Sequence, residues 1–423
     1  MITVGLDFGT HQSKVCIEKI EGAECEYSFM KFENEYHEEF YALPSIINVG
    51  ADGRLSYGLL PRNTKGELIR YFKQDAFRIN SIGSLMQTNA MILSCWYLAY
   101  ILFDLEKLYG QEFTVQMGAP TDSEHLHETQ QIAVQILASA YRLVEEVFQN
   151  DKDAFLATDI ITLVKKTEIL PYSDKLKEEY GILVFPEAYA CLKPLTSRGK
   201  IANGMNLMVD IGGGTTDISF FTIELDKNKN VNIPQVYDFF SIDKGLNFLT
   251  DATPSSEKKE LDSNVNSEDE IITEKIVLFN DSIEKECNNL HSRLLKEFRE
   301  QGSLSVSRFN EALKNRPIIY CGGGSTFPIL RKNYGEFNSI VHVSDQEWDK
   351  KSVKNMDEIS ELNLCPILST AYGLSIHAID DNIECKPFKD IFAGIRQTKK
   401  NKNSTSKDDS YDRNVYNDYD AIK

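Results

Sequence analysis

The sequence predicts an α/β protein with two domains, and three observations support this class. The chain has 423 residues, which exceeds the length at which a single hydrophobic core stops growing. Segments with strand character alternate with segments of helical character, which is typical of α/β folds. A strand that ends on aspartate, a glycine-containing turn and a second strand occur twice, at 4–17 and at 207–221.

Each copy of this motif is expected to form a β-hairpin with a polar tip. The first reads V-G-L-D-F-G-T-H-Q-S-K-V-C-I and the second L-M-V-D-I-G-G-G-T-T-D-I-S-F-F. Glycine lets backbone N–H groups approach an anion closely, so two such tips that face each other would form a phosphate clamp. Further hydroxyl donors flank the turns at Thr10, Ser13, Thr215 and Thr216.

An aspartate at the end of a strand is often only a turn former. Its recurrence at the same position of two matching hairpins, as Asp7 and Asp210, favours a role in the site. Asp217, which follows the second tip, is expected to support that tip by hydrogen bonding rather than to take part in chemistry.

Two long apolar segments are predicted to be helices. The stretch 90–103 is too short to span a bilayer, which needs about 20 apolar residues, so we expect a helix buried between a sheet and other helices. Residues 123–148 carry an apolar stripe with helical spacing. Its members are Ile132, Ile136, Ala140, Leu143 and Val147.

Composition excludes some classes of function. The net charge of −18 offers no basic footprint for DNA or RNA, so nucleic acid is not expected as a direct partner. The N-terminal residues lack the pattern of a signal peptide, and we expect a cytoplasmic protein without a membrane span. The eight cysteines have no metal-ligand spacing and are expected to be reduced thiols, mostly in the core.

Two polar stretches interrupt the chain. Residues 251–270 have almost no apolar content and are expected to form a surface insertion ahead of a helix. Residues 397–423 are expected to be a disordered tail.

A third glycine cluster completes the predicted site. The segment P-I-I-Y-C-G-G-G-S-T-F-P-I-L at 317–330 has a strand, a glycine turn and the start of a helix. The order of two D-x-G tips and a late G-G-G-S, with F-P-E-A-Y-A-C-L at 185–192 before the second tip, resembles the ATPase domain shared by actin, sugar kinases and the 70 kDa heat-shock (DnaK-type) chaperones. The resemblance covers residues 2 to about 394 and is nearest the DnaK-type domain.

This resemblance implies two duplicated ribonuclease-H-like sheets with a nucleotide cleft between them. It places domain I at 1–185, with a helix returning at 366–394, and domain II at 186–365. It also implies ATP or ADP with Mg²⁺ as ligands. The implied phosphate and nucleotide contacts are Gly9, Thr10, Ser13, Gly212, Gly213, Gly214, Thr215, Gly322, Gly323, Gly324 and Ser325.

The catalytic residues that the resemblance implies are acidic. Asp7 and Asp210 would orient Mg²⁺, largely through its waters, and the attacking water, while Glu187 would connect the two halves and help to hold the hydration shell of the metal. Slow hydrolysis is then expected, with the ATP and ADP states setting the angle between the domains.

The chain departs from the chaperone pattern at several places. It ends soon after 365–376, so the peptide-binding domain is not expected. The usual G-G-x-x-F-D appears as K-G-L-N-F-L-T at 244–250, and Phe327 replaces the basic residue after G-G-S-T. Lys73 lies in the region of the chaperone catalytic lysine, but a solvated surface lysine is the expected interpretation.

Several functions remain open at this point. The preferred one is an ATPase whose nucleotide state gates a protein partner. A filament-forming actin-like protein is the alternative, because K-G-L-N-F-L-T and the long segment between 121 and 185 resemble ParM-type actins. A kinase of the same fold lacks a distinct acceptor motif, and an ATP-binding protein without turnover is also compatible with the sequence.

Overall fold

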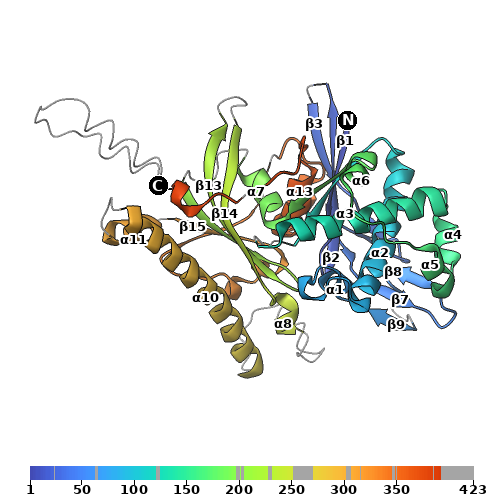
Figure 1. The fold of residues 1–423 in the computed structure, drawn as a ribbon, viewed down its shortest axis with the longest axis horizontal. Helices are drawn as coiled ribbons and strands as arrows, with labels where there is room; N and C mark the ends of the chain where they lie inside the picture. The colour runs from blue at the N-terminus through green and yellow to red at the C-terminus, as the bar shows by residue number, and fades with distance from the viewer. Residues whose placement is uncertain are drawn as a thin grey trace, which may run out of the picture. The chain divides into compact units, whose positions relative to one another are not determined.

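Two compact α/β units make up the chain (Figure 1). The computed structural model describes residues 1–22, 24–61, 65–120, 124–196, 201, 204–226, 231–250, 270–301, 306–314, 316–344, 348, 350–383 and 385–391. The first unit comprises Met1–Pro194, Gly212–Gly214 and Trp348–Ile383. The second comprises Leu195–Ile211, Thr215–Glu347 and Glu384–Lys423. Residues 251–269 of the predicted insertion at 251–270, and the whole predicted tail at 397–423, lie outside the described residues.

The central sheet of the first unit has the strand order β11-β10-β1-β2-β3. Strands β1, β2 and β3 form an antiparallel meander, whereas β10 and β11 join β1 in parallel. Strand β1 is central and almost fully buried, which explains its near-continuous apolar sequence. The bounds are β1 Ile2–Asp7, β2 Gln12–Glu21, β3 Glu24–Phe29, β10 Thr114–Ala119 and β11 Ile182–Pro186.

Short strands and helices complete the first unit. The strands between β3 and α1 are β4 Phe32–Glu33, β5 Glu39–Phe40, β6 Leu43–Pro44, β7 Ile47–Val49, β8 Leu55–Tyr57 and β9 Glu67–Ile69. The helices are α1 Phe72–Ala76, η1 Ile79–Ser81, α2 Leu85–Tyr109, α3 Leu126–Arg142, η2 Leu143–Val147, α4 Lys152–Ala157, α5 Ile160–Lys166, α6 Asp174–Glu179, α7 Glu187–Thr196, α12 Met356–Glu361 and α13 Cys365–Ser375.

The second unit repeats the same sheet topology, with the order β14-β13-β12-β15-β16. Again the first three strands in sequence are antiparallel neighbours, and the last two join the first in parallel. The elements are β12 Gly204–Ile211, β13 Thr216–Asp226, β14 Val231–Ile242, α8 Leu246–Thr250, α10 Glu270–Gln301, α11 Val306–Lys314, β15 Pro317–Cys321, η3 Gly323–Thr326, η4 Pro328–Leu330, β16 Ser339–His342 and α14 Phe388–Ile391. This duplication confirms the predicted α/β class with two similar sheet units.

Three helices fall outside the predicted domain limits: α7 and α12 belong to the first unit, and α14 belongs to the second. Helix α7 belongs to the first unit because it packs closely on α13: a Cβ on Gly373 would lie 1.7 Å from the carbonyl oxygen of Ala190. Helix α13 returns to the first unit and packs on β1, β2 and β10, whereas α14 belongs to the second unit.

The predicted apolar helix is α2, and it is longer than the apolar stretch that indicated it. Ser84 caps its first turn by accepting a hydrogen bond from the Gln87 N–H, and Gly110 ends it at φ 67°. Its length and composition alone would suit a membrane span, but 67% of its apolar window is buried inside the protein. The predicted second helix is α3, and its apolar stripe continues into a π-helical turn at Leu143–Val147.

Candidate functional site

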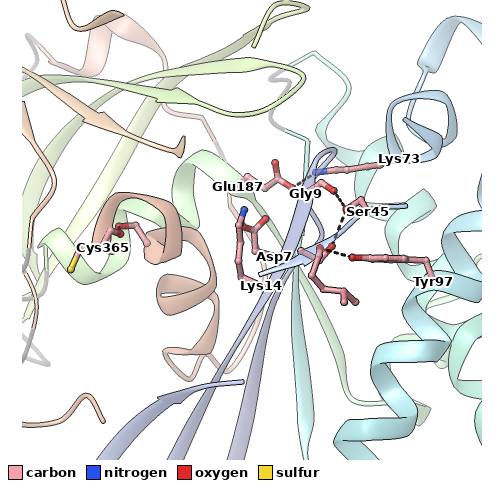
Figure 2. Close-up of polar contacts among 11 residues, drawn as sticks. Asp7, Gly9, Lys14, Ser45, Lys73, Tyr97, Glu187 and Cys365 are labelled. Atoms are coloured by element: carbon pink, nitrogen blue, oxygen red, sulfur yellow. Dashed lines mark hydrogen bonds and ion pairs between the residues drawn. The ribbon is translucent and has the colours of Figure 1, made fainter. Parts of the chain in front are cut away.

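The first predicted tip lies between β1 and β2. Asp7 is the last residue of β1, and Lys14 is directly opposite it in the antiparallel register. The two side chains form an ion pair in which Nζ of Lys14 lies 2.9 Å from Oδ2 of Asp7, as Figure 2 shows. Only 8% of the Asp7 side chain is exposed, so this carboxylate is a buried charge with one oxygen engaged by an ammonium group.

The turn after Asp7 is held by a second segment of the first unit. Ser45 donates its hydroxyl to the carbonyl oxygen of Gly9 at 2.6 Å, and its N–H donates to the carbonyl oxygen of His11 at 2.9 Å. A Cβ on Gly9 would lie 2.1 Å from the carbonyl oxygen of Gln12, so this position requires glycine. The backbone of the tip is therefore fixed before any ligand arrives.

The other predicted residues of this tip differ in exposure. Ser13 is fully buried, and its hydroxyl lies 3.4 Å from the Ser45 hydroxyl, so it supports the turn from beneath. Thr10 is partly exposed. Phe8, inside the turn, stacks on Phe72 of α1 and on Tyr97 of α2, with ring centroids 6.2 and 5.9 Å away. The tip thus rests on an aromatic cluster.

Lys73 and Glu187 form another buried ion pair of the first unit. Lys73 lies on α1, and Glu187 is the first residue of α7, directly after β11. Nζ of Lys73 lies 2.5 Å from Oε1 of Glu187 (Figure 2). The expectation that Lys73 is a solvated surface residue is wrong, because only 4% of the residue is exposed. Packing of the neighbouring Phe72 into the aromatic cluster draws α1 inward.

The electrostatics of this group follow from burial. Burial raises the pKa of the Glu187 carboxyl above its ordinary value, the Lys73 ammonium opposes that rise, and the charge of Asp7 adds to it. Gly118 of β10 leaves room for this carboxylate, since a Cβ there would lie 2.8 Å from Cγ of Glu187. Two carboxylates and two ammonium groups are thus arranged beside one glycine turn.

The second tip follows β12. Asp210 pairs in register with Asp217 on β13 and with Cys321 on β15. The Thr215 hydroxyl donates to Oδ2 of Asp217 at 3.4 Å, which agrees with the predicted supporting role of Asp217. Gly212, Gly213 and Gly214 are grouped with the first unit, although β12 and β13 on either side of them belong to the second.

The third glycine cluster lies beside Asp210 in the second unit. Gly322 has φ 80°, and a Cβ on it would lie 2.2 Å from Oδ1 of Asp210. Gly324 packs as closely on Ile211, whereas a Cβ on Gly323 would meet no atom within 4 Å. Ser325 is fully buried in the short helix that follows. The turn therefore presents backbone at Gly323 and carboxylate at Asp210.

The predicted residues thus gather in two groups, one in each unit. The first contains Asp7, Gly9, Thr10, Ser13 and Glu187, together with Gly212–Gly214, and the second contains Asp210, Thr215 and 322–325. The facing of Asp7 and Asp210 across a cleft stays a prediction. Sequence reasoning missed Lys14 and Ser45. Lys14 could have been found from hairpin register, because it lies opposite Asp7 once the turn is centred on residues 8–13.

Comparisons with known proteins find similar solved structures and no matching family. No protein-family model matches the chain, and no curated protein matches it. Among solved structures it is similar to MreB 5 of Spiroplasma citri bound to AMPPNP, at 13% sequence identity and a TM-score of 0.39, over 95% of this chain and 98% of that chain. At this identity and TM-score, the similarity decides nothing about the ligand or the activity of this chain.

Proposed function

We propose that the chain binds ATP with Mg²⁺, hydrolyses it slowly, and uses its nucleotide state as a conformational switch for a protein partner in the cytoplasm. One observation carries this proposal. The same hairpin, with aspartate at the end of its first strand and a glycine turn after it, occupies the same place in two sheets of identical topology. Turn chemistry alone does not require an aspartate at both positions.

The donor set fits a polyphosphate with a hydrated metal ion. Mg²⁺ prefers oxygen ligands and keeps several of its waters. One oxygen of Asp7 already accepts from Lys14, which suits contact through water better than direct coordination. When bound, Mg²⁺ would neutralise charge on the phosphate oxygens.

The residues of the chain would act mainly by position and charge. The backbone amides near Gly9 and Gly213 would hold phosphate oxygens, since glycine permits close approach. Lys14 and Lys73 supply ammonium groups beside the first tip. Asp7, Asp210 or Glu187 would orient the attacking water, and Glu187 is the carboxylate whose pKa burial raises.

The partner-gated switch is preferred because it requires no self-complementary surface. A filament-forming protein requires head-to-tail contacts that repeat, and a net charge of −18 would oppose them at low ionic strength. The more specific resemblances, to DnaK-type proteins for the switch and to ParM-type proteins for the filament, belong to this proposal.

The experiment that tests the proposal combines phosphate release with light scattering over a protein concentration series, with Mg-ATP, with Mg-ADP or with neither. Hydrolysis at constant small size supports the switch. Scattering that requires ATP and shows a critical concentration supports a filament instead. Tight binding of ATP without phosphate release would leave a nucleotide-binding scaffold without turnover.

The decisive variants are Asp7→Asn and Asp210→Asn. Each removes a charge at a tip while it preserves shape, so phosphate release should fall by at least about 100-fold and the circular dichroism spectrum should not change. Asp153→Asn, on the exposed surface of α4, is the matched control and should keep full activity. Unchanged turnover in both tip variants would remove the proposed site.

A further inference from the structure

A histidine contacts the third glycine cluster from a neighbouring strand. Ser325 lies in the short helix η3, and His342 is the last residue of β16, in the same unit. Nε2 of His342 lies 3.1 Å from Oγ of Ser325. No sequence pattern connects these two residues, because the glycine motif ends before β16 begins.

The direction of this hydrogen bond follows from counting protons. Oγ of Ser325 also lies 2.7 Å from the carbonyl oxygen of Gly322. A carbonyl oxygen can only accept, and a serine hydroxyl carries one proton, so Ser325 must donate to Gly322. The hydroxyl then has only lone pairs for His342, and Nε2 of His342 must carry the proton that joins them.

These hydrogen bonds hold the carbonyl group of Gly322 in place. The Gly322 carbonyl accepts from the Ser325 hydroxyl and also from the Ser325 N–H, at 3.1 Å. Gly322 itself has φ 80° and leaves no room for a Cβ beside Asp210. Gly324 packs closely on Ile211, as Gly322 does on Asp210, so the open surface of the turn lies at Gly323.

We propose that His342 is a positioning residue: through Ser325 it holds the Gly322–Gly324 turn in a shape whose open surface at Gly323 receives the planar base of a nucleotide. The proposal rests on the proposed function for the identity of the ligand. Its structural part, the fixing of the turn by an Nε2-protonated His342, concerns the protein without any ligand.

Two measurements on the ligand-free, full-length protein test the structural part. With ¹⁵N-histidine labelling, NMR should show the His342 ring protonated at Nε2, and its ring nitrogen signals should shift in Ser325→Ala. Hydrogen exchange at the Ser325 amide should accelerate about tenfold in His342→Leu, because a lost hydrogen bond weakens the turn. In His342→Gln, whose side-chain NH₂ can replace the Nε2 donor, exchange should stay within about twofold of wild type.

Nucleotide affinity tests the functional part with the same variants. Binding of a fluorescent ATP analogue with Mg²⁺ should weaken about tenfold in His342→Leu and in Ser325→Ala, and the double variant should be no weaker than either single variant. His342→Gln should recover most of the affinity. His291→Gln is the matched control, because His291 also bonds through Nε2, to Oδ1 of Asn310 on a different surface.

The outcomes separate this proposal from the proposed function. A His342 ring protonated only at Nδ1, or Ser325 amide exchange in His342→Leu equal to wild type, would overturn the positioning role whatever the protein binds. Wild-type affinity in His342→Leu would overturn it as well. If the wild-type protein binds no nucleotide, the proposed function fails and with it the ligand named here, while the ring and amide measurements still decide whether His342 fixes the turn.

Discussion

Buried ionic groups are the most informative residues of the first unit. Lys73 and Glu187 are 114 positions apart in sequence yet form an ion pair whose side chains are 5% and 12% exposed. A buried pair of this kind adds little to stability compared with an apolar pair of the same shape. The location of this ion pair beside the first glycine tip is better explained by a role in the proposed nucleotide site.

Replacement of Lys73 by methionine should destabilise the protein strongly. Glu187 would keep its burial and lose its ammonium partner, so its pKa should rise further and the free energy of unfolding should fall by about 3 kcal/mol at neutral pH. Urea unfolding measures the change. Lys19→Met, which breaks the exposed pair with Glu21, is the control and should change stability little. If Lys73→Met and Lys19→Met lost the same free energy of unfolding, burial would not determine the cost of breaking the ion pair.

Glu106, near the end of α2, is a buried carboxyl in a different environment. It is 8% exposed, and both of its carboxylate oxygens are buried. Burial, with a smaller contribution from the charge of Glu145, raises its pKa from 4.5 to about 7. The folded protein therefore holds a proton here that the unfolded chain releases at lower pH.

This shift predicts that stability falls as pH rises from about 4.5 through about 7, because the folded state binds more protons in that range. Glu106→Gln removes the titration, so its stability relative to wild type should increase by about 2 kcal/mol between pH 5 and pH 8. Urea midpoints at several pH values measure this. Glu112→Gln, an exposed residue soon after α2, controls for loss of a surface charge. A difference that does not depend on pH would show that Glu106 does not titrate in this way.

At the scale of elements, the strand order that the two sheets share places both acidic tips. In each unit the first strand is central and its hairpin partner is antiparallel, so the turn between them lies at the same edge as the end of the fourth strand. In the second unit this edge also carries the glycine cluster after β15. The three motifs therefore follow from topology and not from separate local features.

Two neighbouring glycines of that cluster should respond differently to alanine. Gly322→Ala should lower the free energy of unfolding by about 2 kcal/mol, because φ is 80° and its Cβ would contact Asp210. Gly323→Ala should leave stability unchanged, since its Cβ would enter open space. It should nevertheless weaken nucleotide binding, because a methyl group would occupy the proposed ligand surface. Full affinity in Gly323→Ala would show that the ligand does not lie on this turn.

At the scale of the whole molecule, each of the two sheets has a large buried cluster of its own among the described residues. One contains residues of β1, β10 and α2, and the other contains residues of β12, β15 and α10. Both tryptophans of the chain, Trp96 and Trp348, are buried in the first unit. Tryptophan fluorescence therefore reports the first unit alone, whereas circular dichroism reports both.

If the two cores unfold independently, urea curves measured by fluorescence and by far-ultraviolet circular dichroism should not coincide. Saturating Mg-ATP should shift the fluorescence curve to higher urea. At a ligand concentration 100 times its dissociation constant, the free energy of unfolding should rise by about 2.7 kcal/mol. Asp7→Asn provides the control for the ligand effect. Coincident curves for the ligand-free protein would mean that the two units unfold as one.

Local pattern determined most of what the sequence predicted correctly. The hairpins around Asp7 and Asp210 and the buried helix α2 depend on neighbours in the chain. The fold class followed because the hairpin occurs twice. The prediction that Lys73 lies on the surface was wrong. Its burial depends on Phe72, Phe8 and Tyr97, which come from three separate segments of the chain.

The sequence by itself determined the duplicated α/β class, the two acidic tips and the third glycine cluster, because strand alternation, glycine turns and terminal aspartates are properties of consecutive residues. Only the tertiary structure decided that Lys73 pairs with Glu187, that α7 packs with the first unit, and that His342 contacts Ser325. Such contacts join residues that the chain brings together only when sheets and helices pack, and no periodicity in the sequence encodes a contact between two distant segments.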